Sequence, residues 1–126
     1  MGADGAFQVA LNYPGTFSVV GMHSPVLRAY ETAPAYFGDR TYFDGHAPQG
    51  LARSRTAGAR GLTIELDSGT FDAWRGNVDD FESELDSLKL PHVANLTWPG
   101  GHEGGYWTTH ADDYLRFYAS ALAGSR

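Results

Sequence analysis

The sequence of 126 residues contains no cysteine. This absence excludes a disulfide, a thiolate nucleophile and a thiolate metal site, and it leaves the redox compartment open. Basic residues are few, with nine Lys and Arg against fifteen Asp and Glu, and they form no run. The formal net charge of −6 therefore offers no attraction for phosphate backbones or anionic lipids, so we expect neither nucleic acid nor a membrane surface as a partner.

Long apolar segments are also lacking. Residues 1–6 contain no basic stretch followed by an apolar one, and no later window holds eighteen apolar residues, so neither a signal peptide nor a transmembrane helix is predicted. The chain does contain 42% apolar residues, including seven Phe, seven Tyr and three Trp, which is enough for a packed interior. At this length we expect one domain, residues 1–126.

Three segments favour β-strands, namely residues 17–22, 62–66 and 92–98. The first is apolar enough to be buried on both faces of a sheet. Residues 6–11 have helical character, which Pro14 and Gly15 end. Residues 25–61, rich in Gly, Pro and aromatic residues, predict a long loop with one helical turn.

Helices are expected after the second and third strands. In the first of them, apolar residues recur at spacings of three and four: Val78, Phe81, Leu85 and Leu88. Asn77 is its expected N-cap, with Asp79 and Asp80 in the first turn. The last helix covers residues 109–123, with an apolar face formed by Tyr114, Leu115, Tyr118 and Leu122.

Three strands that are each followed by a helix are typical of βα units, which close through right-handed crossovers into a parallel sheet. The expected fold is therefore a three-layer α/β structure with three βα units. Chemistry in open parallel sheets gathers at the carboxyl ends of the strands. Asp72 and His102 both lie just beyond such ends.

Four stretches carry a resemblance to a known family: residues 1–6 (MGADGA), 20–25 (VGMHSP), 66–72 (LDSGTFD) and 98–102 (WPGGH) followed by Tyr106-Trp107. Together they resemble the C-terminal half of the α/β-hydrolase branch that includes S-formylglutathione hydrolases, enterochelin-esterase-like and feruloyl esterases, and mycolyltransferases. The last two stretches are the specific ones. The likeness covers nearly the whole chain.

This resemblance implies a serine ester hydrolase whose residues follow the order serine, acid, histidine. In the elbow G-x-S-x-G of these enzymes, the residue after the nucleophile corresponds to Met1. The serine would then fall directly before Met1, and the early strands would be missing too. We therefore expect a partial domain that lacks the nucleophilic serine, with Met1 beside the substrate.

The same resemblance implies roles for His102 as general base and for Asp72 as the acid that orients its ring. Asp80 is the alternative acid, because mycolyltransferase-like members take theirs from the start of the following helix. The alternative interpretation of Asp72 is structural, because aspartate is common in turns, where its side chain hydrogen-bonds to the backbone. We expect His23, His46, His92 and His110 to be structural or solvated.

Aromatic residues near His102 are candidates for a substrate cleft, although large aromatics more often belong to a core. We expect Trp107 and Tyr106 to contact the substrate, and we favour Trp74 and Trp98 less for this role. Glu103 beside His102 lacks further ligands at metal-binding spacing, and no nucleotide-binding glycine motif is present. We therefore expect no metal and no cofactor.

Three hypotheses of function follow. The first is an esterase fragment that acts on a small-molecule ester through an acyl-serine intermediate. The second is a non-catalytic unit that forms a homo-oligomer through the exposed edge of its first strand. The third is a small esterase with another nucleophile, for which Ser24 and Ser68 are the serines near strand ends.

Overall fold

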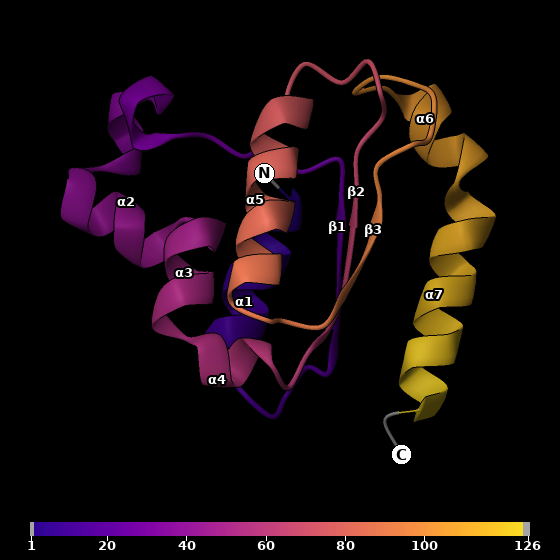
Figure 1. Cartoon of the computed structure of the whole chain (residues 1–126), viewed down its shortest axis with the longest axis horizontal. Coiled ribbons are helices and arrows are strands. Elements are labelled where there is room, and N and C mark those ends of the chain that lie inside the picture. The colour runs from indigo at the N-terminus through magenta and orange to yellow at the C-terminus, as the bar shows by residue number, and fades with distance from the viewer. Residues whose placement is uncertain (1, 125–126) are drawn as a thin grey trace.

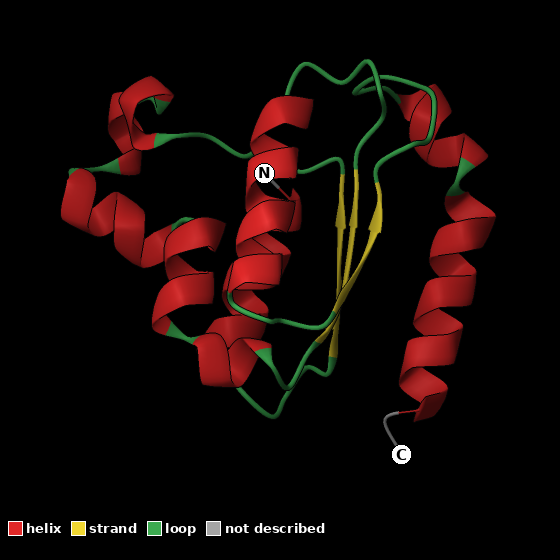
Figure 2. Ribbon diagram, viewed as in Figure 1, coloured by secondary structure: helices red, strands yellow, loops and turns green. Residues whose placement is uncertain are grey.

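The computed structural model describes residues 2–124 and has three layers (Figure 1). A sheet of three parallel strands forms the middle layer: β1 (Val19–His23), β2 (Thr63–Asp67) and β3 (His92–Asn95), in the order β1-β2-β3 (Figure 2). Helices α1 (Gly2–Asn12) and α5 (Arg75–Ser87) cover one face, and α7 (Ala111–Gly124) covers the other. The expected three-layer α/β fold with βα units is confirmed.

The main core lies between the sheet and the layer formed by α1 and α5. Side chains alternate along β1 and β2, so Met22, Ile64 and Leu66 all face this layer and are fully buried. Phe7 of α1 meets Phe81 of α5 edge to face, with ring centroids 5.7 Å apart. This apolar contact fixes both helices against the strands. Within residues 2–124, no helix is both long and apolar enough to pass through a bilayer.

The segment between β1 and β2 is helical, so the prediction of a long loop was wrong. It contains α2 (Arg40–His46), α3 (Pro48–Ser54), α4 (Thr56–Ala59) and two short 3-10 turns, Tyr30–Thr32 and Ala35–Phe37. Local chemistry explains the starts: the Asp39 carboxylate accepts a hydrogen bond from Tyr42 N at 2.8 Å, and Pro48 occupies the first turn of α3. Helices of one or two turns are too short to show an apolar period.

Two details of β1 and α5 also differ from expectation. β1 is not buried on both faces, because its residues alternate between half-buried and buried. α5 begins at Arg75, so Asn77 lies inside its first turn and Trp74 holds the N-cap position. The Asn77 side chain instead donates to Leu27 O at 2.7 Å and ties α5 to the segment after β1. Helix-capping propensity predicted Asn77 as the N-cap, but its side chain makes a tertiary hydrogen bond instead.

The C-terminal part forms two helices, α6 (Gly104–Thr109) and α7, which meet at His110. No residue of Ala111–Gly124 is buried, and the expected apolar face is only half right: Leu115 and Leu122 are 66% and 54% exposed. The sheet contacts α7 through Tyr114 and Tyr118 instead. Gly21 makes the close approach possible, since a Cβ there would overlap the Tyr118 hydroxyl.

The sheet face under α7 is polar. Asp67 at the end of β2 is fully buried, and its Oδ2 lies 2.6 Å from His23 Nδ1. Its Oδ1 accepts hydrogen bonds from Tyr106 OH at 2.8 Å and Tyr114 OH at 3.3 Å. Burial and the negative charge of Asp67 raise the pKa of both tyrosines, which keeps them protonated as donors. One carboxylate thus ties β1, α6 and α7 together.

Glu65, two residues before Asp67 and on the same face of the sheet, has fewer hydrogen-bond partners than Asp67. It is 2% exposed; its Oε1 accepts from Asn95 Nδ2 at 2.9 Å, whereas its Oε2 has no hydrogen-bond partner. Burial raises the pKa of this carboxyl from 4.5 to about 6. The folded protein therefore binds the Glu65 proton more tightly than the unfolded chain does.

The first prediction concerns this proton. Glu65 should stabilise the fold most below pH 4.5 and lose that contribution as pH rises through about 6. Glu65→Gln removes the ionisation, so its unfolding free energy relative to wild type should increase by about 2 kcal/mol between pH 4.5 and 7.5. Urea unfolding at both pH values measures this change. The exposed control Glu103→Gln should show no such increase, and parallel curves for Glu65→Gln and wild type would contradict the prediction.

Candidate active site

The loops that follow β2 and β3 lie side by side at the carboxyl edge of the sheet. Backbone hydrogen bonds join them: Thr70 N donates to Trp98 O, and Phe71 N donates to Gly100 O, both at 2.9 Å. A Cβ on Gly69 would overlap the carbonyl of Gly100, so glycine is required for this approach. The contact holds the loop of residues 68–74, called the acidic loop, against the loop of residues 96–103, called the histidine loop.

His102 and Asp72 meet across these two loops. His102 Nδ1 lies 3.1 Å from Asp72 Oδ2; the Asp72 side chain is fully buried and the His102 side chain is 34% exposed. The other Asp72 oxygen, Oδ1, accepts from Trp74 N at 2.9 Å. A carboxylate only accepts, so Nδ1 donates and a neutral His102 ring carries its lone pair on Nε2. This arrangement suits a general base that is oriented by a buried acid.

The Asp72 carboxylate makes the hydrogen bond expected from each of the two interpretations of this residue. Its bond to Trp74 N is the turn-forming bond expected of an aspartate at this position, and its bond to His102 is the one expected of a triad acid. Asp80 is exposed on α5, and its side chain has no hydrogen bond to His102 in the described part of the chain. The geometry thus favours Asp72 as the acid.

The aromatic candidates separate clearly. Trp107 meets the His102 ring edge to face, with centroids 5.2 Å apart, and so borders the site. Tyr106 is 3% exposed and hydrogen-bonds Asp67, which favours a structural role. Phe71, 82% exposed beside Asp72, was not singled out in the sequence; an apolar residue next to the acid in a tight turn was the available signal. Met1 lies outside the described residues.

The two alternative nucleophiles are enclosed. Ser24 is 3% exposed and Ser68 is fully buried, and neither hydroxyl oxygen has a hydrogen-bond partner. Ser24 has a φ of 45°, the left-handed region, at the end of β1. A substrate carbonyl would need to displace other residues to reach either oxygen.

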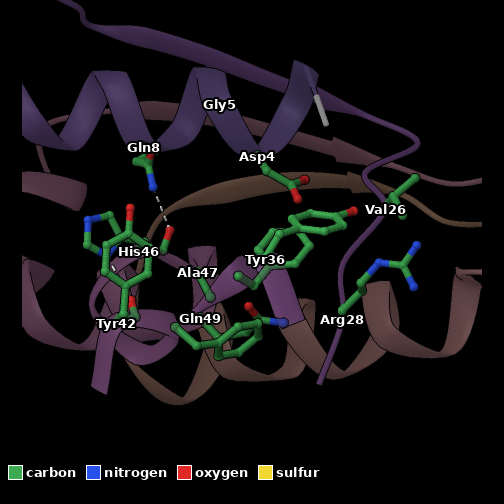
Figure 3. Close-up of a pocket in the computed structure, with 12 residues that line it drawn as sticks. Asp4, Gly5, Gln8, Val26, Arg28, Tyr36, Tyr42, His46, Ala47 and Gln49 are labelled. Carbon is green, nitrogen blue, oxygen red and sulfur yellow. Dashed lines mark hydrogen bonds between the residues drawn. The ribbon is translucent and has the colours of Figure 1, made fainter. Parts of the chain in front are cut away.

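A pocket of about 340 Å³ opens elsewhere, between the first turns of α1 and the helices α2 and α3 (Figure 3). Its walls include the rings of Tyr36, Tyr42 and His46, and Gln8 bridges the two sides by donating to His46 O at 2.9 Å. Asp4 also lines it, and burial raises the pKa of that carboxyl. Neither His102 nor Asp72 lines this pocket, so it is separate from the site.

Solved structures share this fold. A ferulic acid esterase matches 96% of the chain with a TM-score of 0.75 and 18% identity, over 49% of its own length. The S-formylglutathione hydrolase FrmB from Staphylococcus aureus, as the apoenzyme, matches 93% with a TM-score of 0.73 and 20% identity, over 47% of its length. No family model matches the chain, and no curated protein matches its sequence.

The chain therefore spans about half the length of the two hydrolase structures that it resembles. Their identities, 18% and 20%, establish a shared fold. They confirm the expected α/β fold, which the chain shares with about half of each hydrolase structure.

The second prediction concerns the proton on the His102 ring. In Asp72→Asn, the amide oxygen should remain at the Oδ1 position to accept from Trp74 N, so the amide NH2 faces His102 and donates to Nδ1. The neutral ring should then carry its proton on Nε2, the reverse of wild type. Nitrogen-15 NMR of the imidazole distinguishes the two tautomers. Asp80→Asn is the matched control, and an unchanged tautomer in Asp72→Asn would refute the assignment.

Proposed function

We propose that this chain supplies the general base and the orienting acid of a serine ester hydrolase. The observation that carries the proposal is the hydrogen bond between His102 and the buried Asp72, on loops that follow adjacent parallel strands. The fold it shares with a ferulic acid esterase and an S-formylglutathione hydrolase supports the same reaction class. Because a fold alone does not determine chemistry, the proposal rests on the geometry of His102 and Asp72.

The proposed reaction passes through an acyl-serine. His102 Nε2 takes the proton of a serine hydroxyl as its oxygen attacks the ester carbonyl, and then gives that proton to the leaving alcohol. A water molecule next loses a proton to Nε2 as its oxygen attacks the acyl-serine. Nε2 then returns that proton to the serine oxygen as the bond to the acyl group breaks and the carboxylic acid is released. Asp72 keeps the ring in the tautomer that accepts at Nε2 and stabilises the imidazolium that forms.

The nucleophile in this proposal stands in an elbow directly before Met1. The backbone N–H of Met1 would then be one of the two donors to the oxyanion, as is usual for the residue after the nucleophile. The substrate is a small-molecule ester held against Trp107, whose ring already abuts His102, and the exposed Phe71. Ser24 and Ser68 are the weaker alternatives, because both are enclosed.

The third prediction tests the position of the nucleophile with the chain of 126 residues. Without the elbow serine, the chain should hydrolyse p-nitrophenyl acetate no faster than its His102→Ala variant. A fluorophosphonate probe followed by mass mapping should label no serine. Labelling of Ser24 or Ser68 that requires His102 would instead place the nucleophile within the chain.

A chimera tests the activity itself. The half of the ferulic acid esterase that the chain does not match, which on this proposal carries the nucleophile elbow, is joined before residue 2. Ester hydrolysis should appear and fall on the order of 10⁴-fold in His102→Ala and Asp72→Asn, but not in Asp80→Asn. The tautomer of His102 reports whether the site is intact. A chimera with the wild-type tautomer and no hydrolysis dependent on His102 would refute the proposal.

A second candidate function is assembly through the edge of β1. Ser18 O and Ser24 N bond to β2, so alternation directs the backbone groups of Val19, Gly21 and His23 to the open side. Beside this edge lies a groove of about 440 Å³ that is mainly apolar and includes Val9 and Phe17, 44% and 45% exposed. An apolar edge with unpaired backbone groups favours pairing with a strand of another chain, here a second copy.

The fourth prediction tests this edge. Val19→Pro removes an N–H that faces outward, so it should block pairing across the edge while preserving the bonds to β2. Light scattering after size exclusion should show a dimer or larger species for wild type and a monomer for Val19→Pro. Val93→Lys, on the other edge strand, is the control and should leave the assembly unchanged. A wild-type monomer at low micromolar concentration would contradict the proposal.

A further inference from the structure

Three potential metal ligands meet where α5 ends and β3 begins. Glu82 and Asp86 stand one turn apart on α5, and His92 opens β3; the nearest ligand atoms of the three all lie within 4.8 Å of one another. We call them the 82/86/92 cluster. No sequence pattern indicates this cluster, because its members belong to two elements and match no metal-binding motif. His102 follows the opposite end of β3, so the cluster is distinct from the candidate active site.

The orientation of His92 points to a cation. Its side chain is 7% exposed, and its Nδ1 donates to Leu90 O at 2.9 Å, because a carbonyl oxygen only accepts. A neutral ring therefore carries its lone pair on Nε2. That atom faces Glu82 Oε1 at 3.7 Å and Asp86 Oδ1 at 4.0 Å, both beyond hydrogen-bond length. A lone pair directed at two carboxylates is repulsive unless a positive charge lies between them.

In the described part of the chain, neither Lys nor Arg supplies this charge to the carboxylates of the cluster. On the same helix, Asp79 pairs with Arg75 at 2.7 Å and Glu84 pairs with Arg53 at 2.9 Å. Within residues 2–124, no Lys or Arg lies at ion-pair distance from Glu82 or Asp86, whose only such neighbour is His92. Two carboxylates thus converge on one nearly buried imidazole nitrogen, and no Lys or Arg of the described residues compensates their negative charge.

We propose that the 82/86/92 cluster binds a divalent transition metal of the zinc class through His92 Nε2, Glu82 Oε1 and Asp86 Oδ1. Zinc takes nitrogen and oxygen ligands at about 2.0–2.2 Å in a tetrahedron, which separates them by about 3.3 Å. The present separations are 3.7 and 4.0 Å from His92 Nε2 and at most 4.8 Å within the cluster. Binding therefore requires the ligand atoms to approach one another by about 0.5–1.5 Å, and the Asp86 side chain is 71% exposed and free to move. Water completes the tetrahedron.

The surroundings fit this class of ion. An imidazole ligand selects zinc and its neighbours over magnesium and calcium, which prefer oxygen. The Leu90 carbonyl fixes the ring through its other nitrogen, as partners of metal-bound histidines usually do. His92 also borders a groove at the amino ends of β2 and β3, through which an ion can enter. The bound ion would join α5 to β3 across residues 88–91 and stabilise the fold.

The fifth prediction is a rise in Tm on the order of 10 °C when zinc is added to EDTA-stripped protein at about 100 times its Kd. His92→Asn removes Nε2, yet its amide can still donate to Leu90 O; Glu82→Gln removes one carboxylate. Both variants should lose most of the rise. Asp80→Asn, which removes a carboxylate from the same helix outside the cluster, should retain it. Magnesium should have no effect on any of these proteins.

Binding at other histidines is measured separately. Calorimetric titration of wild type should give one tight zinc site, and zinc should shift the Nε2 resonance of His92 in nitrogen-15 NMR. An equal rise in Tm in all variants would place the ion elsewhere and overturn the proposal. No rise in wild type would also overturn the proposal. If His92→Asn does not fold, Glu82→Gln and the NMR shift decide.

Discussion

The fully buried carboxylate of Asp67 organises the C-terminal half of the molecule. It accepts hydrogen bonds from Tyr106 and Tyr114 and pairs with His23, so it joins the central strand to its neighbour and to both last helices. A buried charge is tolerated only when its hydrogen-bonding capacity is used, and here three side chains use it. The loop of His102 leads directly into α6. The position of that histidine therefore depends on this carboxylate as well as on Asp72.

The two faces of the sheet are held by different physics. Against α1 and α5, alternating apolar side chains such as Ile64 and Leu66 pack without polar atoms and gain from burial alone. Against α7, in which no residue is buried, the contact rests on directional hydrogen bonds. Burying Glu65 among them costs stability whenever that carboxyl ionises. The helix that covers the polar face is thus the more readily loosened layer.

Sequence patterns predicted α5, α7 and the three strands, and they predicted residues 6–11 of α1, which begins earlier, at Gly2. They failed for α2, α3 and α4, which are too short for a period to show, and for the break at His110, which no Gly or Pro marks. Glu65 and Asp67 alternate with apolar residues as on a solvated face, and only the tertiary fold covers them. At the site, Asp72 and His102 were singled out because both follow strand ends and lie in stretches that resemble the hydrolase family, and the structure brings their side chains within 3.1 Å of each other. Phe71 was missed because its exposure beside Asp72 follows from the tertiary fold, and its position next to the acid was the only local signal.

Backbone contact between the acidic and histidine loops also bears on how such sites can be altered. Gly69 lies against Gly100 with no room for a side chain, and two backbone hydrogen bonds reinforce the contact. The loops therefore form a single structural unit, although they come from separate βα connections. Insertions or grafts in one loop should be tolerated only beyond the segment that contacts the other. Protein engineering of this half would need to exchange the two loops together.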